Sequence, residues 1–281
     1  MSYKTILVHC NDERRMQRLL VPAVQLAEAF QSHLIALSVV PPVSVISAGP
    51  PNGPPIVLDE HCKAYRERNP ALKSAFEAAT RGRSLVGDWR EDEADAFGIA
   101  ARVLEYARAC DLVIASQKDA AWPWADLLDV PERLAIESGR PVLLVPHAAS
   151  VPARVGEKIL LAWNGRREAT RAVYDALPIL KGANAVKVIW INPRLETEAS
   201  LDFPAADICA ALARHSVRCE ATEQIKPWGS VGEMLLACAN EMEADLLVMG
   251  CYGHTRLREL VFGGASRHVL AHMSLPVLMS H

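Results

Sequence analysis

The residues best suited to chemistry lie near the C-terminal end of the chain, where glycines stand in two groups. Two residues separate the first two glycines, and nine residues separate the second glycine from the third. The two groups and the small residues that follow them are Gly250, Gly253, Gly263, Gly264, Ala265 and Ser266. Glycine lets backbone N–H groups approach phosphate oxygens without obstruction by a Cβ atom. The spacing therefore predicts a phosphate-binding loop, and two purely structural turns are the alternative.

The position of the glycines favours the phosphate-binding interpretation. Gly250 follows a predicted strand, and Ser266 opens a predicted helix whose N-terminal donors and dipole attract anions. In parallel sheets, ligands bind beyond the carboxyl ends of the strands. Arg256, Arg258 and Arg267 add positive charge nearby.

The chain contains two copies of one module. Residues 245–281 resemble residues 111–147, because each copy runs from Asp-Leu through a loop to Pro-Val-Leu. The openings also match, with Lys4 and Lys158 each preceding a short apolar run. Such self-similarity indicates a tandem repeat. We expect modules at residues 1–147 and 156–281, joined by a short linker.

Short apolar strands alternate with amphipathic helices in both modules, which predicts an α/β fold of two doubly wound modules with mainly parallel sheets and helices on both faces. The predicted strands are residues 5–9, 34–40, 84–89, 112–115, 141–145, 159–163, 185–191, 217–224, 245–249 and 276–279. The predicted helices are residues 13–31, 60–80, 94–109, 167–180, 204–215, 231–242 and 266–273. Residues 41–55 carry six prolines and two glycines, so a loop without regular structure is expected there.

The glycine spacing, the residues around it (249–264) and the closing Pro-Val-Leu resemble the nucleotide loop of the universal stress protein family. The resemblance covers the whole chain as a tandem pair. It implies Rossmann-like modules, similar to adenine nucleotide α-hydrolases, with five parallel strands each. It also implies that ATP, with or without Mg²⁺, binds the C-terminal module. The implied cofactor-binding residues are Ala162, Asn164, Ile191, Met249, Gly250, Gly253, His254, Arg256, Gly263, Gly264, Ala265 and Ser266.

Two positions depart from the family's pattern. The family usually has an aspartate where Asn164 stands, and asparagine keeps a hydrogen-bond acceptor but loses the charge. The family also favours a hydroxyl residue where Gly264 stands, so one phosphate contact is missing unless Ser266 supplies it. These departures leave a nucleotide-free scaffold as an alternative function.

The first module lacks the glycine loop. Residues 116–124 and 128–132 replace the two glycine groups, and the carboxylates of Asp126 and Asp129 would repel a triphosphate. We expect this module to have lost nucleotide binding and to serve a structural role. Trp122 and Trp124 either form an interface or cover the edge of a core.

Two other groupings carry weaker signals. His268 and His272 have a spacing that can hold a metal, but no carboxylate or cysteine accompanies them, so a solvated helix face is favoured. His9 and Cys10 could form a nucleophilic pair, although no residue is predicted to orient the histidine. No catalytic residue is assigned.

Composition limits the remaining possibilities. The net charge of -3 gives no support for nucleic acid or an anionic membrane as a partner, and no apolar run could span a bilayer. The seven cysteines are scattered without a Cys-x-x-Cys pair, which indicates reduced thiols in the cytoplasm.

We therefore expect a cytoplasmic stress-response protein that binds ATP in its C-terminal module and acts as a sensor or interaction switch. The alternatives are the nucleotide-free scaffold and a slow ATP hydrolase that uses Glu259. The two modules are expected to pair within the chain, and the sequence leaves a further homodimer open.

Overall fold

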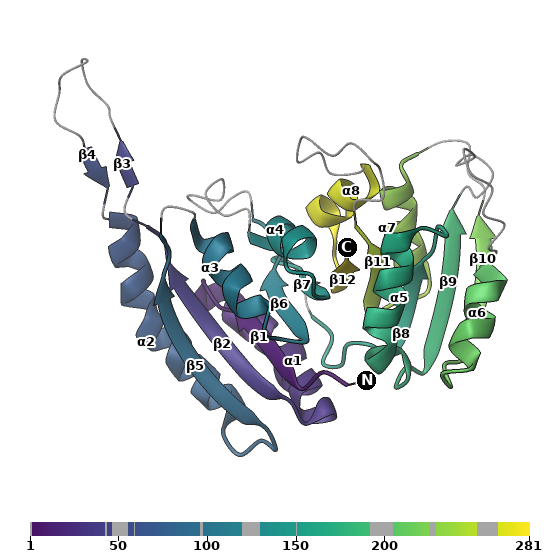
Figure 1. Ribbon diagram of the computed structural model, residues 1–281, viewed down its shortest axis with the longest axis horizontal. Coiled ribbons are helices and arrows are strands. Elements are labelled where there is room, and N and C mark those ends of the chain that lie inside the picture. The colour runs from purple at the N-terminus through teal and green to yellow at the C-terminus, as the bar shows by residue number, and fades with distance from the viewer. Residues whose placement is uncertain are drawn as a thin grey trace.

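The computed structural model (Figure 1) describes ten stretches of the chain. They are residues 2–42, 44–46, 56–58, 60–95, 98–119, 130–149, 151–191, 205–224, 229–251 and 264–281. All structural statements below concern these residues.

The N-terminal module contributes five parallel strands to the main sheet, in the order β5-β2-β1-β6-β7. They are β1 (Thr5–His9), β2 (His33–Val40), β5 (Val86–Glu93), β6 (Leu112–Ser116) and β7 (Val142–Val145). Its helices are α1 (Glu13–Phe30), α2 (Glu60–Thr80), α3 (Gly98–Ala107) and α4 (Val130–Glu137).

The C-terminal module has the same design, with five parallel strands in the order β10-β9-β8-β11-β12. They are β8 (Lys158–Ala162), β9 (Ala185–Ile191), β10 (Glu220–Gln224), β11 (Leu246–Gly250) and β12 (Val277–Ser280). Its helices are α5 (Arg167–Leu180), α6 (Ala205–Ala213), α7 (Val231–Glu241) and α8 (Gly264–His272). The predicted fold class is confirmed, and most predicted elements agree with the structure to within a few residues.

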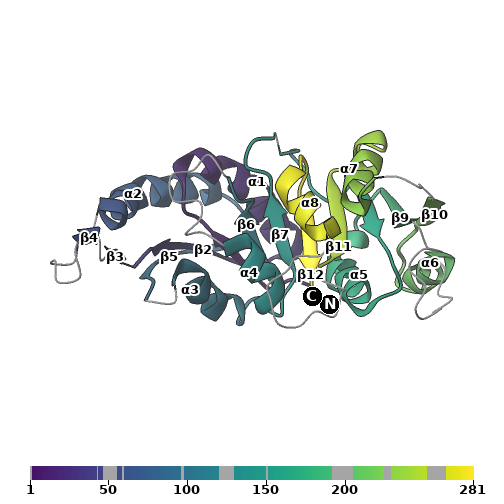
Figure 2. The same ribbon diagram turned by 90° about the horizontal axis from the view of Figure 1, so that it is seen from above.

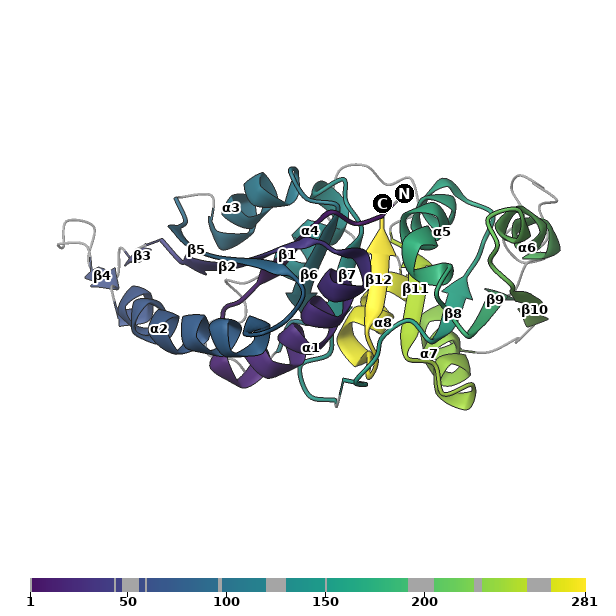
Figure 3. The same cartoon turned by 90° about the horizontal axis from the view of Figure 1, so that it is seen from below.

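The two sets of strands merge into a single ten-stranded sheet. The last strands of the two modules, β7 and β12, pair antiparallel, with Leu143 opposite Leu278. The sheet runs through the whole molecule with helices on both sides, and both chain termini lie close to the central strands (Figures 2 and 3). Because this one pairing is antiparallel, the carboxyl ends of the two strand sets point in opposite directions.

The alternating apolar residues of the strands explain why both faces of the sheet are covered. Ile6 and Val8 belong to one buried cluster and Leu7 to another, since successive strand side chains point to opposite faces. Helices α1, α5 and α6 pack into the first cluster. Helices α3, α4, α7 and α8 pack into the second, and α2 contributes to both.

Two expectations about secondary structure were wrong. The segment predicted as an irregular loop contains β3 (Ser44–Ile46), which pairs antiparallel with β4 (Ile56–Leu58). This strand pair projects from the outer end of the N-terminal module, beside α2 (Figure 1). The β-branched residue types in these two short runs favour strands despite the prolines between them. The sequence interpretation also missed α4, although Pro131 in its first turn suits a helix start.

None of the helices in the described part of the chain is long and apolar enough to cross a membrane.

Candidate functional site

A cavity of about 380 Å³ opens at the carboxyl ends of the C-terminal strands. The residues at or next to the ends of β8, β9 and β11 form its floor, among them Ala162, Ile191 and Gly250. Its volume lies within the range of small-molecule sites, roughly 300–1,000 Å³. The cavity lies where a doubly wound sheet places its ligands.

Three helices begin at this cavity. Arg166, Glu168 and Ala169 line it from the start of α5, Ser230 and Val231 from the start of α7, and Gly264, Ala265 and Ser266 from the start of α8. The first N–H groups of a helix lack partners within the helix, and the helix dipole adds partial positive charge there. Three such ends around one cavity favour an anionic ligand.

The helix starts differ in how they are capped. Ser230 accepts a hydrogen bond from the Glu233 amide at 3.1 Å, which occupies one donor of α7. Arg166 makes no side-chain cap hydrogen bond at the start of α5. Asn164 accepts a hydrogen bond from the Arg166 amide at 3.1 Å, which shapes the loop between β8 and α5.

Glycine at position 250 is required by packing. A Cβ atom there would lie 2.4 Å from the carbonyl carbon of Glu168 and 2.5 Å from the amide nitrogen of Ala169. The end of β11 therefore packs directly against the first turn of α5. Gly232 plays a similar part between α7 and α8, since its Cβ would lie 2.7 Å from the Ala265 carbonyl oxygen. Gly264 differs, because a Cβ there would meet no atom within 4 Å.

One wall of the cavity is apolar. Ile189 and Ile191 of β9 face it together with Val231 and Leu235 of α7. An apolar wall beside converging backbone donors suits a ligand with a flat, weakly polar part and an anionic part.

The acidic residue Glu168 also lines the cavity. The Glu168 side chain is 13% exposed, and one of its oxygens lies 3.3 Å from Nε of Arg167, whose side chain is largely in solvent. Burial, followed by the charge of Glu168, raises the pKa of the nearby Cys251 thiol. Cys251 is fully buried, and its single S–H has two acceptors, the carbonyl oxygens of Ala135 and Ser280, each 3.4 Å from the sulfur, so it is held as a neutral thiol.

The structure places eight of the predicted nucleotide-binding residues on this cavity. They are Ala162, Asn164, Ile191, Met249, Gly250, Gly264, Ala265 and Ser266. Gly253, His254, Arg256 and Gly263 lie outside the described residues. The sequence interpretation did not select the wall residues of α5 and α7. For α7, the Ser-x-x-Glu pattern from Ser230 to Glu233 is a signal that marks such a helix start.

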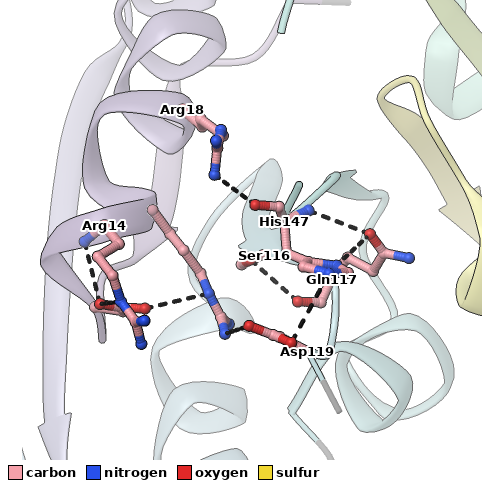
Figure 4. Close-up of polar contacts among 8 residues, drawn as sticks. Arg14, Arg18, Ser116, Gln117, Asp119 and His147 are labelled. Carbon is pink, nitrogen blue, oxygen red and sulfur yellow. Dashed lines mark hydrogen bonds and ion pairs between the residues drawn. The ribbon is translucent and has the colours of Figure 1, made fainter. Parts of the chain in front are cut away.

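The corresponding strand ends of the N-terminal module are filled by a polar cluster (Figure 4). Asp12 caps α1 by accepting a hydrogen bond from the Arg14 amide at 3.1 Å. Its carboxylate also lies 3.3 Å from Nε of Arg15, and Arg15 donates to Asp119 at 3.0 Å. The side chains of Asp12 and Arg15 are 6% and 8% exposed. The protein's own carboxylates therefore lie at the strand ends of this module.

The cluster continues to the other module. The Nδ1 atom of His147 lies 2.9 Å from Oε1 of Gln117, and Arg18 donates to the His147 carbonyl (Figure 4). Nε2 of Gln117 donates at 2.8 Å to the carbonyl of Leu270 in α8. The residues of this module singled out in the sequence, Trp122, Trp124, Asp126 and Asp129, lie outside the described residues.

The two weaker groupings are not assembled as sites. His9 is fully buried and burial lowers its pKa to about 4, while the buried Cys10 thiol, whose pKa burial raises, donates to the Val8 carbonyl. His268 and His272 stack with ring centroids 4.3 Å apart, and Nδ1 of His272 lies 2.9 Å from the His268 carbonyl oxygen. The described part of the chain contains no group of three or more residues that could hold a metal.

A known protein family matches the C-terminal module. The model of the universal stress protein family matches residues 157–281. This half of the chain is a universal stress protein domain. None of the curated proteins compared with the chain matches it.

Solved structures extend the similarity of the fold to both modules. A universal stress protein from Archaeoglobus fulgidus DSM 4304 is 15% identical, with a TM-score of 0.68 over 98% of this chain and 97% of that one. A functionally unknown protein from Pseudomonas aeruginosa PAO1 is 18% identical, with a TM-score of 0.57 over 99% of this chain and 92% of that one. The predicted resemblance to the universal stress protein family is confirmed for residues 157–281, and both modules share the fold of these structures.

Proposed function

We propose that the C-terminal module, residues 156–281, binds ATP in the cavity between β8, β9 and β11. The observation that carries this proposal is the convergence of the N-termini of α5, α7 and α8 on one cavity. The phosphates would lie against Gly264, Ala265 and Ser266, and adenine against the apolar wall that includes Ile191. The universal stress protein domain supports an adenine nucleotide as the ligand.

Mg²⁺ fits this cavity as a companion of the nucleotide. Mg²⁺ in proteins keeps several waters and is held by one or two carboxylates together with substrate phosphates. Glu168 and Ser266 line the cavity, and their carboxylate and hydroxyl would be the oxygen donors to the ion. The ion would neutralise the repulsion between Glu168 and the phosphates. Glu259, the carboxylate considered for ATP hydrolysis, lies outside the described residues.

We propose that the N-terminal module, residues 1–147, binds no nucleotide and serves as a structural partner that pairs with the C-terminal module within the chain. The antiparallel contact between β7 and β12 and the hydrogen bond from Gln117 to Leu270 support this pairing. Nucleotide binding at α8 would then act on the interface between the modules, as a sensor or switch in the stress response. The scattered cysteines, none of them in a Cys-x-x-Cys pair, support a cytoplasmic location.

Gly264→Asp tests the proposal with little risk to the fold. Position 264 is exposed and open to a side chain, and an aspartate in the first turn of a helix favours the helix. Its charge would repel phosphates, so the variant should bind ATP at least about tenfold more weakly in isothermal titration calorimetry.

Ala271→Asp is the matched control, because it adds the same charge at an exposed position near the other end of α8. It should bind ATP as the wild type does. Equal binding by Gly264→Asp and wild type would refute the placement of the phosphates. Failure of the wild type to bind millimolar ATP would instead favour the nucleotide-free scaffold.

A further inference from the structure

Two cysteines lie side by side at the outer edge of the C-terminal module. Cys209 belongs to α6, and Cys219 directly precedes β10, the last strand of the sheet. The Cys219 thiol lies 3.9 Å from the Cys209 carbonyl oxygen. A tight turn in which Ser216 adopts φ of 65° brings the two cysteines together.

This pair differs from the other cysteines in exposure. Cys209 and Cys219 are half-buried, whereas the remaining five cysteines are buried. The pair also lines a surface depression of about 470 Å³, together with Ala213 and Ser216. A small polar oxidant can therefore reach these two thiols, and burial protects the others.

We propose that Cys209 and Cys219 form a reversible disulfide when the protein meets a peroxide. The Cys219 sulfur lies 3.9 Å from the backbone of Cys209 and both residues line one depression, so we expect a small movement to bring the two sulfurs to bonding distance. The disulfide would fix α6 to β10, an edge strand whose partner β9 carries Ile191 in the cavity wall. The inference stands on this thiol pair and does not depend on ATP binding.

The reaction is balanced with a peroxide as the two-electron oxidant. The Cys219 thiolate attacks one peroxide oxygen, the O–O bond breaks, and Cys219 becomes a sulfenic acid while hydroxide leaves. The Cys209 sulfur then attacks the Cys219 sulfur, and the departing hydroxide takes the Cys209 proton as water. Burial, and then the neighbouring Cys219 thiol, raise the pKa of Cys209 to about 12. Cys209 therefore stays protonated, and we assign it the second step.

The test is thiol counting with peptide mapping on the full chain. After a small molar excess of hydrogen peroxide, wild type should lose two of its seven thiols toward Ellman's reagent in denaturant. Blocking with N-ethylmaleimide and non-reducing digestion should give one linked pair of peptides, containing Cys209 and Cys219. Dithiothreitol should restore both thiols.

Two variants and a control sharpen the result. Cys209→Ser should leave a Cys219 sulfenic acid that dimedone traps, and Cys219→Ser should resist the same dose of peroxide. Cys110→Ser removes a buried cysteine and should still form the disulfide. The proposal is overturned if wild type links other cysteines, links two chains, or oxidises Cys209 and Cys219 without joining them. Because the peptide map is made on wild type, the result does not depend on the folding of any variant.

Discussion

The carboxyl ends of the strands form an open cavity in one module and a filled polar cluster in the other, although both modules share one strand order. In the C-terminal module, α5 begins without a side-chain cap and Gly250 allows close packing. In the N-terminal module, Asp12 caps α1 and is paired with Arg15. The comparison teaches that a few residues after each strand decide whether a helix N-terminus faces a ligand or the protein's own carboxylate.

The largest expected effect comes from Gly250→Val. The new side chain would meet the backbone of Glu168 and Ala169, which cannot move aside without shifting α5. We expect loss of detectable ATP binding and a fall of about 3 kcal/mol in the free energy of unfolding. Ser116→Val, at the equivalent end of β6, should cost under about 1 kcal/mol. Chemical denaturation and calorimetry check both values, and a Gly250→Val protein as stable as wild type would contradict the packing argument.

The second effect is a pH dependence of stability that only the strand end of the N-terminal module should show. His9 ends β1 where Ala162 ends β8, and burial lowers the pKa of His9 to about 4 from the ordinary value of 6.5. Between these two pKa values His9 is protonated in the unfolded chain and neutral in the folded chain. The free energy of unfolding therefore falls as pH drops from 6.5 towards 4. Between pH 7 and pH 4.5 this should cost about 2–3 kcal/mol.

His9→Ala makes the N-terminal strand end resemble the C-terminal one. The variant should not show the loss of stability that His9 causes between pH 7 and pH 4.5. The measurement is the difference between its urea midpoints at these two pH values. If wild type and variant show the same pH dependence, His9 is not held in the neutral form.

The third effect concerns the cluster that fills the N-terminal strand ends. Asp12→Ala removes the cap of α1 and one partner of the buried Arg15, so we expect a loss of about 2 kcal/mol in stability. ATP affinity should not change. Ser230→Ala removes only a cap, at α7, and should cost about 1 kcal/mol. Equal losses in thermal denaturation of the two variants would mean that the ion pair adds nothing to the cap.

The smallest effect restores a charge in the cavity. Asn164→Asp supplies the carboxylate that the family usually carries, and a charge-assisted hydrogen bond to a ribose hydroxyl should add about 1 kcal/mol, or roughly fivefold in ATP affinity. Asn11→Asp, the same change after β1, should leave affinity unchanged. Calorimetric titration decides, and weaker binding by Asn164→Asp would mean that this side chain does not face the ribose.

Much of the fold could be predicted because its signals are local. The apolar runs of β1 and β8 and the periodic apolar residues of α5 follow from side-chain burial alone. The hairpin of β3 and β4 and the short helix α4 were missed, because prolines in and around these segments outweighed the strand and helix signals.

The candidate site could be predicted only in part. The spacing of the glycines and of the small residues of α8 can be recognised in the sequence alone. Glu168 and Leu235 have no such signal in the sequence, because they line the cavity only through the docking of α5 and α7 on the sheet. The packing role of Gly250 was likewise hidden, since Glu168 is 82 residues away in the chain.

By itself the sequence determined the two α/β modules, the loss of the glycine loop from the first module, and the residues that could contact a phosphate. These features are readable because hydrophobic periodicity and glycine spacing are local signals in the sequence. Only the tertiary structure decided that β7 and β12 join the modules into one sheet and that three helix starts meet at one cavity. It also brought Cys209 and Cys219 together. These features depend on strand pairing, helix docking and turn geometry, and such contacts are set by the packing of the whole chain.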